Sequence, residues 1–379
     1  MPAVREDGGG GDAMSTRQFG IEEELLLVDG SGAPAPRASD LLARCAGADV
    51  LAGTVLEQEF FQAQVEVVTP PLRRLADGEA HLRSGRDALA RAGAHLDVSP
   101  LAVATPVLVA SPGPHVAQDR FARIARHYAG LGGESLMRAL HVHVEVVDRG
   151  EGIAVLDRVR PWLPLLVALS ANSPFWHGRD MGFSSWRSQL WRMWPSSGPH
   201  EVFGDVAEYD ALILRLLRDQ AILDVGLLNL EVRLSARYPT VEFRVADVCT
   251  SLEDTLVVAA LARGLTETAA REAREGVAPA PWRVDGLRSA GWRAGRFGVS
   301  DRLVDPRSGL PVAAAAAFAT LLDHVGDALD DAGDLARVTT GVERIVRDGG
   351  GAGRQRRAAG ADGDLNAVVD DLRVRKLEG

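Results

Sequence analysis

Lysine is almost absent from this chain of 379 residues: Lys376 is the only one, and every other basic residue is an arginine. The chain therefore has no GxxxxGK[ST] motif, whose lysine reaches the phosphates of a bound nucleotide. The body of the chain also lacks a lysine that could form a Schiff base. Biased codon usage explains this composition, but the chemical consequence holds. If the protein binds phosphate, arginine side chains and metal ions must hold it.

Paired cysteines, long apolar runs and an excess of basic charge are lacking as well. Cys45 and Cys249 form no CxxC motif, so they predict two buried, reduced thiols in a cytoplasmic protein rather than a zinc ribbon. The longest apolar run, residues 161–171, is too short to cross a bilayer. The formal net charge of −10 argues against nucleic-acid and anionic-membrane partners, because both need a basic surface.

The composition, 46% hydrophobic and 25% charged, is typical of a globular protein. Residues 1–16 are acidic and rich in glycine, which predicts a flexible tail in which Met14 is an alternative start. No repeat or linker divides the rest, so we expect one domain over residues 17–379. A turn-rich segment at residues 172–205 holds four of the seven tryptophans. A segment this long with little periodicity is more often functional than idle, which predicts an active-site loop.

Periodicity predicts the elements of this domain. Alternating residues indicate strands at 19–28, 54–72 in two pieces, 101–110, 138–148 and 229–248 in two pieces. Helical spacing indicates helices at 74–97, 153–171, 206–222, 251–274 and 312–330. Residues 347–364, rich in glycine and arginine, predict a loop before a short final helix. Because the strands follow one another without strict βαβ alternation, the predicted fold class is α+β, with a largely antiparallel sheet backed by helices.

Acidic and imidazole side chains recur on one face of several predicted strands, while the other face is apolar. They come from four extended regions: Glu22 and Glu24; Glu59 and Glu66; His141, His143 and Glu145; Glu242, beside Arg244. Any one of them alone is more typical of a solvated sheet edge, but their recurrence indicates a common site. Carboxylates packed together repel unless a cation intervenes, so the pattern predicts Mg²⁺ or Mn²⁺, with nearby arginines holding phosphate or a substrate carboxylate.

Five segments, in order, resemble the type 2 glutamate–cysteine ligases, which are bacterial ATP-dependent carboxylate–amine ligases. They are GIEEEL (20–25), FFQAQVEVVTPP (60–71), HVHVEV (141–146), SANSPFWHGRDMGFSSWR (170–187) and RYPTVEFRVADV (237–248). The resemblance covers residues 17–375 and implies a glutamine-synthetase-like sheet curved around the active site. It implies metal and nucleotide-phosphate ligands at Glu22, Glu24, Glu59, Glu66, His141 and Glu242. It also implies catalytic roles for Glu66 and Arg244, and substrate or nucleotide binding by Arg233, Arg244, His143 and Arg187.

The chain departs from the family pattern in two places. Leu234 stands where a proline is expected, and Tyr238-Pro239-Thr240 replaces an aromatic–glycine–threonine turn, so the local loop shape is expected to differ. The spacing of Glu59 and Glu66 is a separate difficulty: seven residues apart, they would face opposite sides of an unbroken strand. We therefore expect a bulge or turn between them.

The resemblance implies that Mg·ATP phosphorylates the γ-carboxylate of L-glutamate and that the amine of L-cysteine then displaces the phosphate. Its partners are then small molecules, with homo-oligomer formation left open. Three alternatives remain at this point. They are the same ligation with another amine, a nucleotide- or amino-acid-binding regulator with a degraded site, and a metal-dependent hydrolase. The tryptophans near Arg187, such as Trp186, contact substrate or merely pack.

Overall fold

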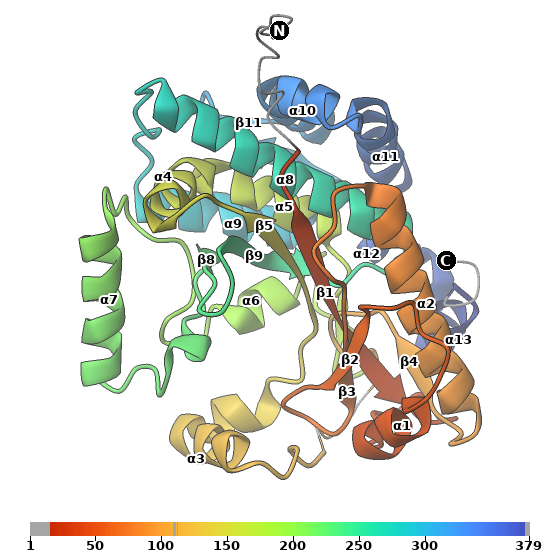
Figure 1. Ribbon diagram of the computed structural model, residues 1–379. Helices are drawn as coiled ribbons and strands as arrows, with labels where there is room; N and C mark the ends of the chain where they lie inside the picture. Colours follow the sequence, from red (N-terminus) through yellow and green to blue (C-terminus); the bar gives the residue numbers. More distant parts are fainter. Residues whose placement is uncertain (1–15, 109–110, 112, 376–379) are drawn as a thin grey trace, which may run out of the picture.

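An antiparallel sheet forms the centre of the computed structural model, which describes residues 16–108, 111 and 113–375 (Figure 1). The strands follow the order β2–β3–β1–β5–β9–β8, and β4 pairs with β1. Their bounds are β1 (Phe19–Val28), β2 (Val55–Gln58), β3 (Gln64–Val68), β4 (Ser99–Leu101), β5 (Ala139–Glu145), β8 (Val232–Leu234) and β9 (Thr240–Asp247). The α+β prediction, with an antiparallel sheet backed by helices, is confirmed.

Helices cover the apolar face of this sheet in two layers. The inner layer comprises α2 (Leu75–Ala94), α4 (Arg149–Val159), α5 (Leu163–Ser170) and α8 (Leu252–Arg274). The outer helices α10 (Ala314–Asp331) and α11 (Leu335–Asp348) pack on α8 (Figure 1). Strand residues such as Ile21, Val65 and Val142 are buried in this core because alternate side chains of each strand point toward the helices. None of the described helices is long and apolar enough to cross a membrane.

The remaining elements lie around this centre. The other helices are α1 (Ala38–Cys45), α3 (Asp119–Glu134), α6 (Arg187–Trp191), α7 (Val206–Arg218), α9 (Val284–Phe297), α12 (Gly350–Ala359) and α13 (Leu365–Arg375), with the 3₁₀ turns η1 (Arg160–Trp162) and η2 (Val225–Leu227). Two small ladders pair β6 (Phe175–Trp176) with β7 (Arg179–Asp180) and β10 (Arg302–Val304) with β11 (Pro311–Ala313). The sequence analysis predicted no element where α3, α9 and α11 lie. The predicted tail, apart from Thr16, falls outside the described residues.

Glu23 is the one acid of the first strand that points toward the helices. Its carboxylate is fully buried and receives two hydrogen bonds from Arg86 of α2, at 2.7 and 2.6 Å. The same guanidinium donates to the carbonyl oxygens of Cys249 and Thr250. A buried charge is tolerated when it is paired and its hydrogen bonds are made, so Glu23 is part of the core and not of the polar face.

Two predicted elements are wrong. Of the strand expected at 101–110, only Leu101 lies in a strand, because the backbone of Ala102 and Ala104 bonds to Asn172 instead of a neighbouring strand; residues 109 and 110 lie outside the described residues. The loop expected at 347–364 contains α12. Gly349 and Gly350 both have positive φ, 77° and 60°, and so they turn the chain from α11 directly into α12. Glycine composition predicted a loop, whereas the glycines serve here as a tight junction between helices.

Candidate active site

The register of the strands builds one polar face. In one row, His143 lies opposite Gly20 and Glu242, and Glu242 lies opposite Arg233. In the next, Glu22 lies opposite His141. In the third, Glu66 lies between Glu24 and Glu57. Side chains paired across antiparallel strands share a face, so the chain brings these groups together from six strands.

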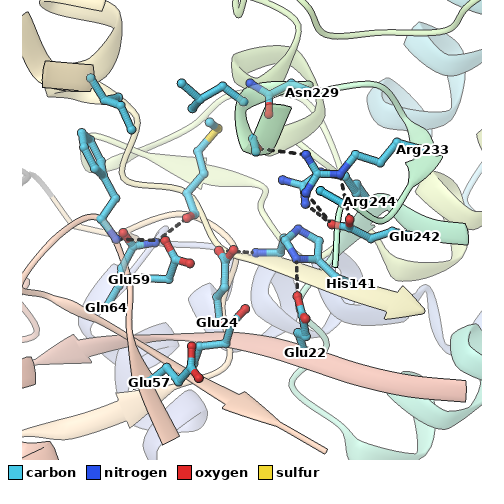
Figure 2. A pocket seen from close by; sticks show the side chains of 18 of the residues that line it. Glu22, Glu24, Glu57, Glu59, Gln64, His141, Asn229, Arg233, Glu242 and Arg244 are labelled. Carbon is cyan, nitrogen blue, oxygen red and sulfur yellow. Dashed lines mark hydrogen bonds and ion pairs between the residues drawn. The ribbon is translucent and has the colours of Figure 1, made fainter. Parts of the chain in front are cut away.

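A cavity of about 670 Å³ opens over this face (Figure 2). The structure places all ten residues predicted for the site on its lining: Glu22, Glu24, Glu59, Glu66, His141, His143, Arg187, Arg233, Glu242 and Arg244. Glu145, which shares their strand parity, lies outside the lining and accepts a hydrogen bond from the backbone of Gln18 at 3.0 Å. Glu59 sits in the turn between β2 and β3, which confirms the expected break before Glu66.

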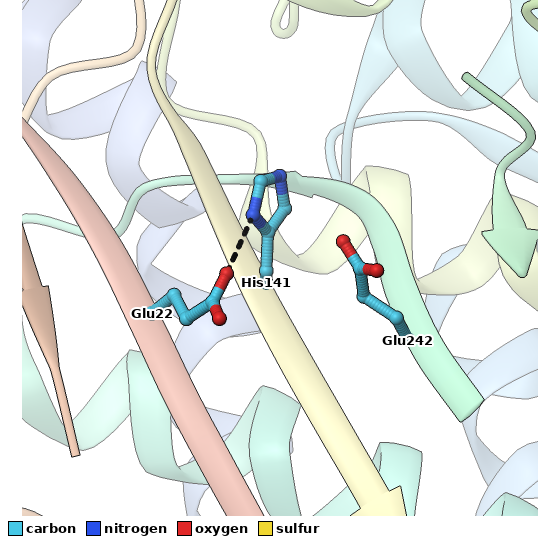
Figure 3. A group of neighbouring side chains, drawn as sticks. All are labelled: Glu22, His141 and Glu242. Carbon is cyan, nitrogen blue, oxygen red and sulfur yellow. Dashed lines mark hydrogen bonds and ion pairs between the residues drawn. The ribbon is translucent and has the colours of Figure 1, made fainter. Parts of the chain in front are cut away.

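Two overlapping groups of side chains have the spacing of cation ligands. One ligand atom each from Glu22, His141 and Glu242 lies within 4.8 Å of the others, and the same holds for Glu24, Glu66 and His141. Figure 3 shows the imidazole of His141 standing between Glu22 and Glu242. Its Nδ1 lies 3.3 Å from Glu22, while its buried Nε2 has no hydrogen-bond partner among the described residues. A free imidazole nitrogen among carboxylates fits a divalent ion such as Mg²⁺ or Mn²⁺.

The acids of the polar face differ in the direction in which their pKa values are shifted. Burial raises the pKa of Glu24 to about 8, with repulsion from Glu59 adding to it. Burial and the surrounding carboxylates raise the pKa of Glu66 well above its usual range. Burial also raises the pKa of Glu59. These three carboxyls resist ionisation because the described structure offers them too little positive charge, which is what a bound cation would supply.

Glu22 and Glu242 show the opposite behaviour. Burial disfavours the charged form of Glu242, but Arg244 and Arg233 outweigh it and hold the pKa of this carboxyl below its usual range. Burial opposes ionisation of Glu22 too, yet hydrogen bonds to His141 and His143 lower its pKa. For His141, burial and then the charge of Arg244 lower the pKa to about 4. Its imidazole is therefore neutral at pH 7, the form that binds a metal.

Arginine side chains and a tryptophan form the wall beyond Glu242. Arg244 donates to Glu242 and lies over the ring of Trp191, 5.3 Å from its centroid. Arg187 lies over the same ring at 5.4 Å and donates to the carbonyl oxygens of Val245 and Arg244. The side chain of Arg187 is only 2% exposed. It therefore holds the strand that carries Arg244, with its donors directed at the protein.

Three tryptophans of the 172–205 segment lie in two different settings. Trp191 and Trp194 line the cavity. Trp186 lies outside the lining and packs against Phe183, with ring centroids 5.2 Å apart.

Sequence reasoning missed several lining residues. Glu57 lies opposite Glu66 once β2 and β3 are paired, and only the hairpin register carries that signal. Arg120 of α3 and Asp224 form an ion pair at the cavity, with two nitrogen–oxygen distances of 3.0 Å. They come from segments with no alternating pattern. Phe60, Phe121, Ile124, Met137 and Leu227 supply an apolar part of the lining.

The family comparison identifies the chain as a ligase. It belongs to glutamate–cysteine ligase family 2, whose family model matches residues 18–371.

Curated relatives match over nearly their whole length. A Streptomyces coelicolor protein named "Putative glutamate–cysteine ligase 2" is 44% identical over 354 residues, which cover 93% of this chain and 97% of the relative. A Paenarthrobacter aurescens protein, "Putative glutamate–cysteine ligase 2-1", is 41% identical over 361 residues and 94% of each chain.

Solved structures share the fold at low identity. A glutamate–cysteine ligase from Francisella tularensis, in complex with AMP, has a TM-score of 0.66 at 14% identity, covering 96% of this chain and 89% of that one. A bifunctional glutathione synthetase from Pasteurella multocida also has a TM-score of 0.66, at 15% identity, covering 97% of this chain and 53% of that one. At sequence identities this low, the similarity shows a shared fold and nothing further.

Proposed function

We propose that this protein joins the γ-carboxylate of L-glutamate to the amine of L-cysteine at the expense of ATP. The products are γ-glutamylcysteine, ADP and phosphate. The observation that carries the proposal is the divided polar face: carboxyls that lack positive charge lie beside an arginine wall in one cavity. Family membership and the names of the relatives support the choice of substrates.

The chemistry needs no covalent bond to the protein. An oxygen of the γ-carboxylate attacks the γ-phosphorus of ATP, the bond to the bridging oxygen of ADP breaks, and γ-glutamyl phosphate forms. The uncharged amine nitrogen attacks the acyl carbon, phosphate leaves with its bridging oxygen, and the nitrogen loses a proton. In such transfers the protein positions the reactants and stabilises developing charge. The absence of a reactive cysteine fits, since both thiols are buried.

Each predicted site residue has a place in this scheme. The ligands proposed for Mg²⁺ or Mn²⁺ are Glu22, Glu24, Glu59, Glu66, His141 and Glu242. A bound cation would neutralise phosphate charge. We assign Glu66 the central ligand role because it lies between Glu24 and Glu57 and has the spacing of a cation ligand with Glu24 and His141. Arg244 and His143 would orient the anionic substrate. Arg187 would hold the strand that carries Arg244, and Arg233, which donates four hydrogen bonds within the protein, would hold the Glu242 carboxylate in place.

The proposed cellular location and partners follow from the reaction. ATP and free amino acids are abundant in the cytoplasm, which is the location we propose. The partners are then small molecules, and a homo-oligomer stays a prediction. The acceptor amine is the part of the scheme that the cavity constrains least, because Phe60, Phe121 and Met137 would also cover a side chain more bulky than that of cysteine.

The test is ADP formation by the purified protein with Mg·ATP and L-glutamate, with and without L-cysteine. We expect cysteine-dependent ADP and a product with the mass of γ-glutamylcysteine, both lost in Glu66→Gln. ADP that forms only with another amine from a panel would keep the ligase chemistry and replace the acceptor. ADP or phosphate formed without any amine would indicate a hydrolase. Nucleotide binding without turnover by any amine would contradict the proposal and favour a regulator.

A further inference from the structure

Arg233 makes more hydrogen bonds than any other arginine on the cavity lining. Its Nε and Nη2 donate to the two carboxylate oxygens of Glu242, at 2.7 and 3.0 Å. Its Nη1 donates to the carbonyl oxygens of Gly226 and Leu228, both at 2.9 Å. A guanidinium has five N–H donors, so four are used within the protein. Arg233 therefore mainly connects two parts of the site, the Glu242 carboxylate and the backbone around η2.

The second of these parts is the wall at η2. Asp224, Gly226, Leu227 and Asn229 all line the cavity. Asp224 is in turn bound to Arg120 of α3 by a two-point ion pair. Gly226 makes this pair possible, because a Cβ there would lie 2.9 Å from both Arg120 Nη2 and Asp224 Oδ1.

These contacts form a continuous path from the floor of the cavity to α3. Figure 2 shows its start, where Arg233 reaches Glu242 beside Arg244. From Arg233 the path runs through the carbonyl oxygens around η2 to Asp224 and then to Arg120. A chain of polar contacts between two elements is a physical basis for coupling between them.

We propose that Arg233 is a positioning residue that couples the cation-binding floor to the η2 wall. Through one planar guanidinium it fixes the Glu242 carboxylate and the backbone of residues 224–228 in a single arrangement. A cation that draws on Glu242 competes with Arg233 for the same oxygens, so cation binding and the order of the η2 wall must influence each other. The proposal rests on the proposed cation site and is independent of the amine acceptor.

The test is hydrogen–deuterium exchange on the full chain, with and without Mn²⁺, in the wild type and in Arg233→Lys. A lysine ammonium keeps the charge but cannot hold a carboxylate and two carbonyls at once. The amides of Leu227 and Leu228, which donate to Asp224 and Val225, report on the wall. We expect them to exchange about tenfold faster in the variant, and the effect of Mn²⁺ on them to disappear.

Arg356→Lys is the matched control. Arg356 also makes two bonds to a carboxylate, that of Asp180, and one to a carbonyl oxygen, that of Phe183, but it lies outside the cavity lining. Its replacement should leave exchange around η2 and turnover unchanged. In Arg233→Lys, kcat should fall by about tenfold or more while the KM for glutamate stays within about twofold, because ground-state binding is kept.

The opposite pattern overturns the proposal. If exchange at residues 224–228 is unchanged in Arg233→Lys and the KM for one substrate rises instead, Arg233 is a substrate ligand. Should Arg233→Lys fail to fold, Asp224→Asn breaks the path at its exposed end. It should then strengthen Mn²⁺ binding by about fivefold, because a less firmly held Arg233 competes less for the Glu242 oxygens, and unchanged Mn²⁺ affinity would refute the coupling. If the wild type binds no Mn²⁺, the proposed cation site fails, while the metal-free exchange rates still decide whether Arg233 holds the wall.

Discussion

The two ends of the polar face carry the same residue type in opposite states. At one end, Glu24, Glu59 and Glu66 have raised pKa values because they are buried beside one another. At the other, Glu242 has a lowered pKa because Arg233 and Arg244 bond to it. The comparison shows that the charge of the neighbouring groups decides whether the pKa of a buried glutamate is raised or lowered. The acid end is suited to a cation, and the arginine end to an anion.

Removing a central acid is the strongest test of the acid end. We expect Glu66→Gln to lower ligation by about 100- to 1,000-fold, because an uncharged amide cannot replace a carboxylate in stabilising the cation and phosphate charge. ADP release and Mn²⁺ binding measure this. Metal-free stability should not fall, since the variant removes repulsion. Turnover near the wild-type rate in Glu66→Gln would refute the assignment of Glu66 as the central cation ligand.

A substitution at the arginine end should lower the free energy of unfolding as well as activity. Glu242→Gln leaves the buried Arg244 and the partly buried Arg233 without their carboxylate, which we expect to cost about 3 kcal/mol in the free energy of unfolding. Urea unfolding of the metal-free protein measures it, with Glu66→Gln as the comparison. Equal stability of the two variants would show that the two ends do not differ as described.

Glu231 separates the effect of burial from that of neighbouring acids. Burial raises the pKa of Glu231 to about 7, and its ion-pair partner Arg192 lies 3.8 Å away. The folded state therefore holds a proton that the unfolded state, with a pKa near 4.5, releases. Its contribution to stability is present at low pH and is lost as pH rises from about 4.5 to 7.

The variant Glu231→Gln removes this dependence. At pH 8 it should be more stable than the wild type by about 2 kcal/mol. At pH 4 the two proteins should be alike, because both side chains are then uncharged. Unfolding curves across this range measure the difference. A constant difference at both pH values would mean that the amide packs differently, and that the pKa of Glu231 is not raised.

Glu57 lies at the outer edge of the acid end, and its replacement should have the smallest effect on ADP release and on stability. Glu57 faces Glu66 across the hairpin but is exposed to solvent, so water screens its charge. We expect Glu57→Gln to change ADP release by less than about threefold and stability by less than about 0.5 kcal/mol. A loss as large as that of Glu66→Gln would extend the cation site to β2.

Much of this site could be predicted from alternation alone. Glu22, Glu24, His141, His143, Glu242 and Arg244 were placed on one face by period two, and the sheet confirms that face. Glu57 was missed because its partner depends on the hairpin register. The helices α3, α9 and α11 were not predicted from the sequence. Helix α12 was mistaken for a loop, because glycine composition does not say whether a turn separates two helices or replaces one.

The sequence by itself determined the chemistry that is available: basic side chains that are all arginines except Lys376, acids at strand spacing and no CxxC motif. These follow from residue identity and from the two-residue period of a strand. Only the tertiary structure decided which acids meet a guanidinium and which meet another acid. It also directed the donors of Arg187 to backbone carbonyls and tied Arg233 to η2. Electrostatic energy depends on distance and burial, and both are fixed only when distant segments pack together.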